Sequence, residues 1–241
     1  MNPVKKRVLR RSLLALLACG LLAACHPRQP PVQVVYRFDE HRWLELKGWH
    51  CEGELWFVDQ KNDIRSQIYY QSYRIFTRKL INTSERYMAV PIWGEAGMRV
   101  SKDYGKTWQG VKFKGDEDDG TETPSYDDIV SVTVVNDQGF LLTRQGRIYM
   151  SSHPFDDPRL APGGPGIDYS IMFRGKPRQY HISPRSPGRG WGLEYIDPPR
   201  VLNQLVYKHY TNFQNLPEAI PEVKDYRGWT HMRCDLGAGL E

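Results

Sequence analysis

The 241-residue sequence lacks the short motifs by which common catalytic sites are recognised. It has no G-x-S-x-G turn to present a serine nucleophile and no H-E-x-x-H zinc motif. Its seven histidines are scattered singly, and an isolated histidine is usually structural. We therefore predict a protein that is not an enzyme and that needs no cofactor or metal.

The N-terminal apolar run is too short for a membrane-spanning helix, which needs about 20 apolar residues. Five basic residues precede it, and Ser12–Ala24 carries no charge. A basic segment, a short apolar segment and small residues are typical of a secretory signal. The sequence Leu22-Ala-Ala-Cys25 resembles the lipobox of bacterial lipoproteins. We predict a signal peptide over 1–24 and lipidation of Cys25, for instance with palmitate; an ordinary signal peptide with an incidental cysteine is the alternative.

The chain that follows the predicted signal peptide has no excess of positive charge. The whole chain has 33 Lys and Arg against 28 Asp and Glu, but five of the basic residues lie within residues 1–24. The remainder therefore carries 28 basic and 28 acidic residues and is formally neutral. A nucleic-acid-binding domain generally has a basic patch or stripe, so we predict no nucleic-acid partner. About 215 residues remain, enough for one domain with a substantial core or for two small ones.

Cysteine is scarce, and its positions fit export. Cys19 lies in the predicted signal and Cys25 in the lipobox, which leaves Cys51 and Cys234. Two remaining thiols in an oxidising compartment are most simply one disulfide, so we predict that these two cysteines are joined. The alternative is a metal pair through His231-x-x-Cys234, but one such pair without a second cluster is weak support for zinc.

Helical periodicity is also scarce, because no convincing 3.6-residue pattern occurs before residue 200. Residues 25–32 are rich in proline and predict a tether, and residues 33–241 predict one β-rich domain. Residues 129–135, 140–144 and 147–150 predict three antiparallel strands with tight turns. One short helix is plausible near 201–210. We expect a mainly β fold of antiparallel meanders, propeller-like or sandwich-like, with at most one or two short helices.

One internal motif is well defined. It matches the Asp-box pattern S-x-D-x-G-x-T-W, at Ser101, Asp103, Gly105, Thr107 and Trp108. In a hairpin turn the carboxylate accepts bonds from turn amides, the glycine takes positive φ, and the tryptophan packs beneath the turn. Asp-boxes generally lie away from active sites, so we interpret this motif as structural.

Two long loops could reach a partner. The first is acidic and contains Asp116, Glu117, Asp118 and Asp119. Its ligand spacing does not suit a calcium loop, so it is either a solvated loop or a partner-facing patch, and we take these four residues as our first partner-binding candidates. The second, 153–166, is rich in proline and glycine, and a loop of this length is often functional or disordered.

A family resemblance goes further than these motifs. The lipobox is followed by Tyr36-Arg-Phe-Asp-Glu-His-Arg-Trp43, by Cys51-Glu-Gly53 before an aromatic strand, by one Asp-box and by Trp229-Thr-His-Met-Arg-Cys234. In this order the chain resembles the immunity lipoproteins that are paired with type VI secretion phospholipase effectors. The resemblance implies a periplasmic protein that binds and blocks a lipase toxin delivered by sibling cells. It carries over no set of contact residues.

The residue after the lipobox cysteine bears on which membrane holds the protein. His26 follows the lipobox cysteine where an aspartate would resemble the inner-membrane retention signal of enteric lipoproteins, so we favour the outer membrane. The rival functions are a sialidase-like glycosidase and a generic envelope scaffold lipoprotein. Arg74 stands in a partial sialidase-like motif, but Phe76 replaces its proline. We interpret Arg74 as an ordinary strand arginine.

Overall fold

The computed structural model describes residues 28–93, 97–113, 124–151, 159, 163–184, 194–196 and 219–240. The chain divides into two compact units, 1–30 and 31–241, and the fold described below is that of the second. The signal peptide, Cys25, the acidic residues Asp116–Asp119 and the helix expected near 201–210 lie outside the described residues, as does most of the 153–166 loop.

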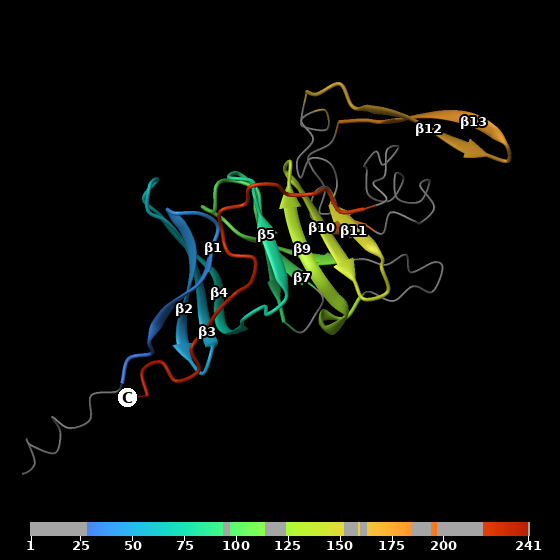
Figure 1. Cartoon of the computed structure of the whole chain (residues 1–241). Helices are drawn as coiled ribbons and strands as arrows, with labels where there is room; N and C mark the ends of the chain where they lie inside the picture. Colours follow the sequence, from blue (N-terminus) through green and yellow to red (C-terminus); the bar gives the residue numbers. More distant parts are fainter. Residues whose placement is uncertain are drawn as a thin grey trace, which may run out of the picture. The chain divides into compact units, whose positions relative to one another are not determined.

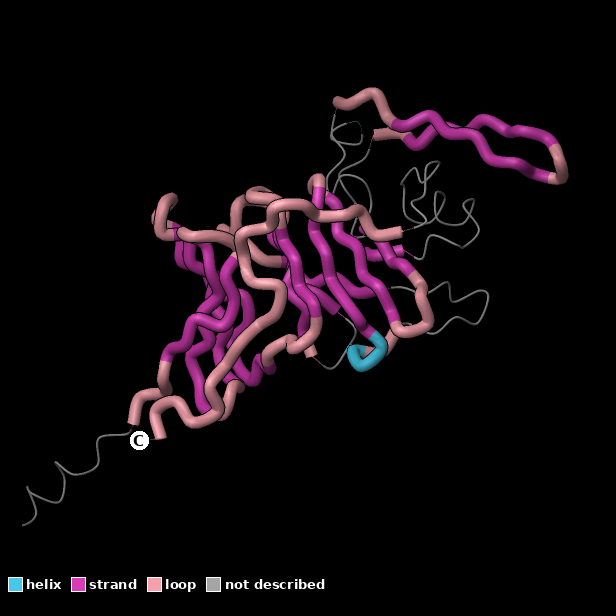
Figure 2. The backbone as a smooth tube through the Cα atoms, in the orientation of Figure 1, coloured by secondary structure: helices cyan, strands magenta, loops and turns pink. Residues whose placement is uncertain are grey.

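Strands make up nearly all of the regular structure in this part of the chain (Figures 1 and 2). A short 3-10 turn, η2 (Tyr126–Asp128), precedes β9. The strands are β1 (Val32–Arg37), β2 (Arg42–Trp49), β3 (Glu52–Asp59), β4 (Ile64–Arg74), β5 (Lys79–Asn82), β6 (Met88–Ile92), β7 (Gly97–Ser101), β8 (Gln109–Phe113), β9 (Ile129–Val135), β10 (Gln138–Thr143), β11 (Ile148–Ser151), β12 (Ile167–Phe173), β13 (Lys176–Ile182) and β14 (Glu194–Ile196).

Strands β1 to β4 form a four-stranded antiparallel meander in chain order. Alternate residues of β2 are buried and half-buried along its whole length, as expected for a sheet with one face on the core. The tight β2–β3 turn holds His50 and Cys51 at positive φ. At the opposite end of β3, the side chain of Asp59 accepts bonds from the backbone N–H groups of Lys61 and Asn62 and fixes the β3–β4 turn.

An eight-stranded sheet has the order β5-β9-β10-β11-β14-β8-β7-β6. The predicted meander of three strands is confirmed as β9, β10 and β11, which pair antiparallel. Two pairs in this sheet are parallel, β5 with β9 and β14 with β8. Strands β12 and β13 form a separate two-stranded antiparallel hairpin. The expectation of a mainly β fold is confirmed, with parallel pairs added to the antiparallel meanders.

One hydrophobic core joins the two larger sheets. Its members come from the inward faces of both sheets, and fully buried examples are Tyr36, Leu44, Phe57, Val100 and Leu141. Aromatic rings meet edge to face within it, as in the pair Tyr36–Phe38 with centroids 5.0 Å apart. Such a shared core explains why residues 31–241 form one compact unit.

The C-terminal segment, residues 226–235, runs between the edges of the two sheets (Figure 1), and we call it the strap. The N–H groups of Trp229 and Arg233 donate to carbonyls of β1, at 2.8 Å each, and the N–H of Leu80 in β5 donates to Thr230 at 2.8 Å. This segment is extended but is not a regular strand. Met232 fills the core beneath it with 5% exposure.

Candidate partner-binding surface

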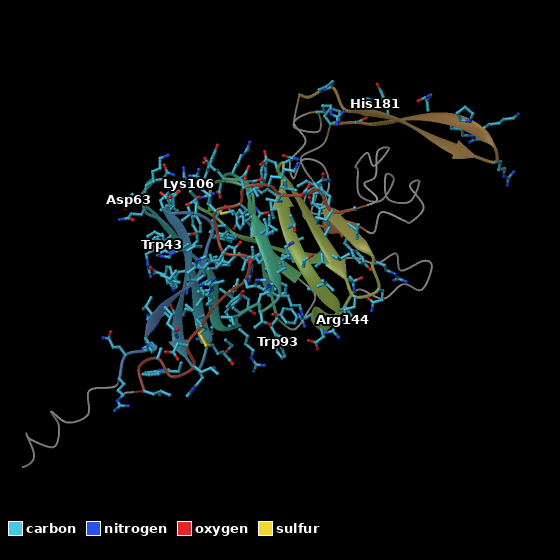
Figure 3. The ribbon with its side chains drawn as sticks, viewed as in Figure 1. Trp43, Asp63, Trp93, Lys106, Arg144 and His181 are labelled. Atoms are coloured by element: carbon cyan, nitrogen blue, oxygen red, sulfur yellow. A yellow bond between two sulfur atoms is a disulfide. The ribbon has the colours of Figure 1, made fainter. Side chains whose placement is uncertain are left out.

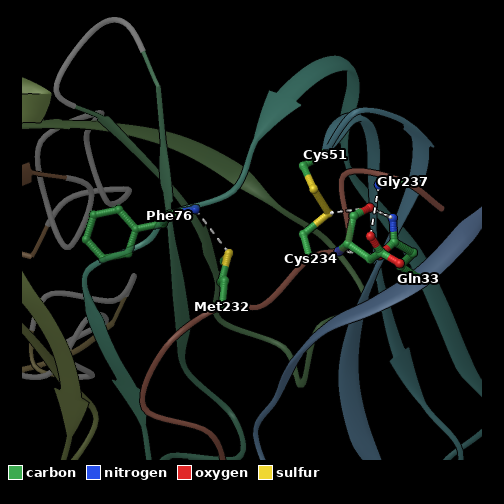
Figure 4. Close-up of a disulfide and its surroundings, with 7 residues drawn as sticks. Gln33, Cys51, Phe76, Met232, Cys234 and Gly237 are labelled. Atoms are coloured by element: carbon green, nitrogen blue, oxygen red, sulfur yellow. Dashed lines mark hydrogen bonds between the residues drawn. A yellow bond between two sulfur atoms is a disulfide. The ribbon is translucent and has the colours of Figure 1, made fainter.

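The disulfide predicted from the two remaining cysteines is present. Cys51 and Cys234 are bonded, and their Cα atoms lie 5.9 Å apart (Figure 4). The bond fixes the C-terminal end of the strap to the β2–β3 turn. Nearby, the side chain of Gln33 donates to the carbonyl of Asp235 at 3.0 Å and accepts from its N–H at 2.8 Å. Because its sulfur is bonded to another cysteine, Cys234 is not the thiolate that a zinc site would need.

The Asp-box residues form a tight turn between β7 and β8. Asp103 accepts hydrogen bonds from the N–H and the hydroxyl of Thr107, at 2.9 and 2.7 Å, and from the hydroxyl of Ser101 at 3.0 Å. Partial burial alone would raise the pKa of Asp103, but the hydrogen bonds from Thr107 and Ser101 outweigh it and lower the pKa below its usual value. Gly105 takes φ +82°.

This hairpin of the eight-stranded sheet is attached to the four-stranded sheet. The indole N–H of Trp108 donates to the hydroxyl of Ser66 on β4 at 2.9 Å, and that hydroxyl donates to the carbonyl of Gly105. The ring of Phe57 on β3 lies against the turn, where a Cβ on Gly105 would overlap it. The contacts of the motif are therefore with the scaffold and join the two sheets.

Two acidic residues that follow the acidic loop are described. Asp128 accepts from the N–H and hydroxyl of Ser125, at 3.3 and 2.8 Å, and these bonds lower its pKa. Asp127 forms an ion pair with Arg78 at 3.3 Å. Both residues thus serve the turn before β9. Among the described residues, no three His, Cys, Asp or Glu side chains are grouped to hold a metal ion.

The outward face of the four-stranded sheet carries a feature that sequence analysis did not predict. Its residues alternate with the core residues of each strand, and they include two tryptophan–arginine stacks. A third stack joins Arg74, at the end of β4, to Trp93, which follows β6 of the eight-stranded sheet (Figure 3 labels Trp43 and Trp93). Arg37 lies 5.3 Å from the ring centre of Trp43, Arg65 lies 4.9 Å from Trp56, and Arg74 lies 4.4 Å from Trp93. We call this the Arg–Trp face.

Glutamates hold the first two tryptophans in place. The indole N–H of Trp43 donates to Glu45 at 3.0 Å, and the same carboxylate forms an ion pair with Arg65 across the sheet. The indole N–H of Trp56 donates to Glu54 at 3.0 Å, and Glu54 lies 3.7 Å from the ammonium of Lys47. Each carboxylate therefore bonds an indole and a cation, so the rings have few alternative positions.

A pocket lies at the Arg74 end of this face. Its volume is about 600 Å³, and it is lined by Glu52, Tyr69, Ser72, Tyr73, Arg74, Ile92 and Trp93. Arg74 donates through Nε to Glu52 at 3.0 Å, which leaves its Nη groups without an acceptor among the described residues. Ser72 has φ +57°, at an irregular stretch of the β3–β4 pairing.

The cations of the Arg–Trp face are accessible to solvent, as is Trp93. The side chains of Lys47, Arg65 and Arg74 are 41%, 49% and 52% exposed, and Trp93 is 53% exposed. The signal that could have revealed the face is the alternation Trp43-x-Glu45-x-Lys47 on one strand. Its partners on β3 and β4 follow only from the strand register.

The fold and this face define a class. The chain is a mainly β protein that carries half-buried tryptophans and exposed arginines on one sheet face, with an exposed tryptophan beside it, and these residue types dominate the binding energy of protein–protein interfaces. Within the described residues, no helix is both long and apolar enough to cross a membrane.

Residues 28–143 match the model of a known family, that of the T6SS Tli3 immunity protein. The match covers just under half of the chain. The resemblance seen in the sequence is confirmed. The match supports a type VI secretion immunity protein.

The other comparisons add little. No curated protein matches the chain. A solved structure described as "YCF48 bound to D1 peptide" is 14% identical, with a TM-score of 0.33, over 51% of this chain. The match spans 37% of that chain, and this likeness supports no argument about fold or function.

Proposed function

We propose that this protein is a lipid-anchored periplasmic immunity protein that binds and inhibits a cognate type VI secretion phospholipase effector. The family match over residues 28–143 carries the proposal. The sequence resemblance to immunity lipoproteins paired with phospholipase effectors supports the choice of a lipase as the partner. The result for the cell is protection from its own toxin and from that of its siblings.

A lipid anchor suits an inhibitor of a lipase. The lipobox Leu22-Ala-Ala-Cys25 would place an acyl chain at the first residue of the mature protein, and Pro-rich residues 26–31 would connect it to β1. A phospholipase must reach a membrane to act, so an anchored inhibitor is concentrated where its target works. His26, rather than aspartate, after Cys25 favours the outer membrane.

A genetic experiment tests the function. The gene is deleted in a strain that keeps the adjacent effector gene, and the strain is grown in contact with its parent. We expect lysis or growth arrest of the deletion strain, with protection restored by the wild-type gene and by an effector knockout in the attacker. A deletion strain that grows as well as its parent under attack would contradict the proposal.

A second experiment tests the anchor separately. Cys25→Ala should abolish labelling by a fatty-acid analogue and release the protein into the soluble periplasmic fraction. The control Cys19→Ala should keep both the labelling and the membrane attachment. Continued labelling of the Cys25→Ala protein would refute lipidation at this position without bearing on effector binding.

A further inference from the structure

We propose that the Arg–Trp face of the four-stranded sheet is the surface on which the effector docks. This inference rests on the proposed function and specifies where the two proteins meet. All four strands of the face, with every residue of the three stacks, lie inside the segment that matches the immunity family. Strands β11 to β14 lie outside that segment.

The composition of the face differs from that of an ordinary solvated sheet face. The exposed side of an antiparallel sheet is normally polar. Here the outward positions include Trp43 and Trp56, and Trp93 extends the face beyond β4. Tryptophan and arginine are the residue types most enriched among side chains whose truncation weakens protein–protein binding.

The face is also ordered before any partner arrives. Ordering a long side chain at an interface costs about 0.5–1.5 kcal/mol, and here much of that ordering is already present. Glu45 holds both Trp43 and Arg65, and Glu52 holds Arg74 against Trp93. A rigid partner can therefore dock with little loss of side-chain freedom.

The available area suits a protein rather than a short peptide. Four strands spaced about 4.8 Å apart and eight residues long, at about 3.3 Å per residue, give a face of roughly 19 by 26 Å, or about 500 Å². A standard interface buries about 800 Å² on each partner. The sheet face alone supplies more than half of this, and the pocket at Arg74 and Trp93 enlarges it.

The charges on the face indicate the chemistry of the partner. The described face carries four cations (Arg37, Lys47, Arg65, Arg74) and three anions (Glu45, Glu52, Glu54). It is close to neutral, so net charge alone does not select a partner. The Nη groups of Arg74 have no acceptor among the described residues and can donate to a partner, and an arginine fork matches a carboxylate. The effector surface should therefore combine apolar area with a carboxylate or carbonyl groups placed at this pocket.

Binding measurements test this assignment. The probe is the purified, catalytically inactivated product of the adjacent effector gene, titrated against the mature domain. The double variant Arg65→Ala/Arg74→Ala should raise Kd by about 30-fold or more, the loss expected for a pair of central arginines. The matched control Arg144→Ala/Lys176→Ala removes two exposed cations outside the face and should change Kd by less than about 3-fold.

A second variant guards against misfolding. Trp93→Ala alters a side chain that is 53% exposed, so the melting temperature should stay close to that of the wild type while Kd rises about 10-fold. If the wild type binds the effector and both the double variant and Trp93→Ala bind it with the same affinity, the docking assignment is overturned and the proposed function stays intact. Absence of wild-type binding would overturn both proposals. A wild-type dimer that the double variant converts to a monomer would assign the face to self-association instead.

Discussion

Replacing the disulfide by Cys51→Ala/Cys234→Ala should strongly destabilise the folded domain. The bond closes a loop with a sequence separation of 183 residues. On the chain-entropy model, a loop of this length corresponds to about 5 kcal/mol of stabilisation at 25 °C, and removal of native disulfides costs about 2–5 kcal/mol. We therefore expect a loss of about 3–5 kcal/mol in the free energy of unfolding.

Loss of the disulfide should increase local opening most along the strap. The disulfide is the covalent link between the β2–β3 turn and a segment that is otherwise held by backbone hydrogen bonds to β1 and β5 and by the buried side chain of Met232. When the link is lost, the strap opens more often. The amide hydrogens of Leu80, Trp229 and Arg233, which form those bonds, should then exchange faster, whereas amides of β9 and β10 should change only with global stability.

The assay is equilibrium unfolding in urea, followed by tryptophan fluorescence and circular dichroism, with the melting temperature as a second measure. A loss of this size lowers the melting temperature of a domain of this length by roughly 10 °C. A reducing agent should reproduce the loss in the wild type and leave the double variant unchanged. A double variant within 1 kcal/mol of the oxidised wild type would refute the reasoning, because the strap would then be held without its bond.

Three further predictions concern the turn motif and the acidic loop. Asp103→Ala should destabilise the folded domain by about 1–3 kcal/mol, because the N–H and hydroxyl of Thr107 lose their acceptor. Since the folded pKa of Asp103 is lowered, the stabilisation by its carboxylate is present above about pH 4 and is lost as pH falls further. Unfolding of the wild type and the variant across this pH range measures the difference. Gly105→Ala should cost about 2 kcal/mol or more, because φ is +82° and the new Cβ overlaps Phe57; chemical denaturation checks this, and an unchanged midpoint would contradict it. Amide substitutions across Asp116–Asp119 should slow association with the effector and weaken its salt dependence; equal on-rates at low salt would remove this loop from the encounter.

Local patterns predicted much of the fold, because turns and the alternation of buried and exposed residues along a strand depend on residues that are neighbours in the sequence. The β9–β10 turn is an example, since Asn136 and Asp137 both take positive φ, as a tight hairpin turn requires. Asp59 likewise fixes the β3–β4 turn through bonds to residues two and three positions further along the chain. The disulfide followed from compartment and count alone, because only two cysteines remained after export.

Other features depend on pairings that no local pattern contains. The register shift in β1 between Val34 and Tyr36 buries Val35 and Tyr36 together, which simple alternation does not predict. The parallel pairs join strands that are far apart in the chain. The Arg–Trp face was missed for the same reason, because Arg65 meets Glu45 only once the sheet register is set, and Trp93 meets Arg74 only once the two sheets pack together.

The most direct test of the account is inhibition of the effector itself. The adjacent effector is assayed for phospholipase activity on vesicles while the purified mature domain is added in increasing amounts, with an unrelated phospholipase as the control. We expect activity to fall to background at a one-to-one molar ratio and the control enzyme to be unaffected. Full effector activity at a several-fold excess of the domain would contradict the account.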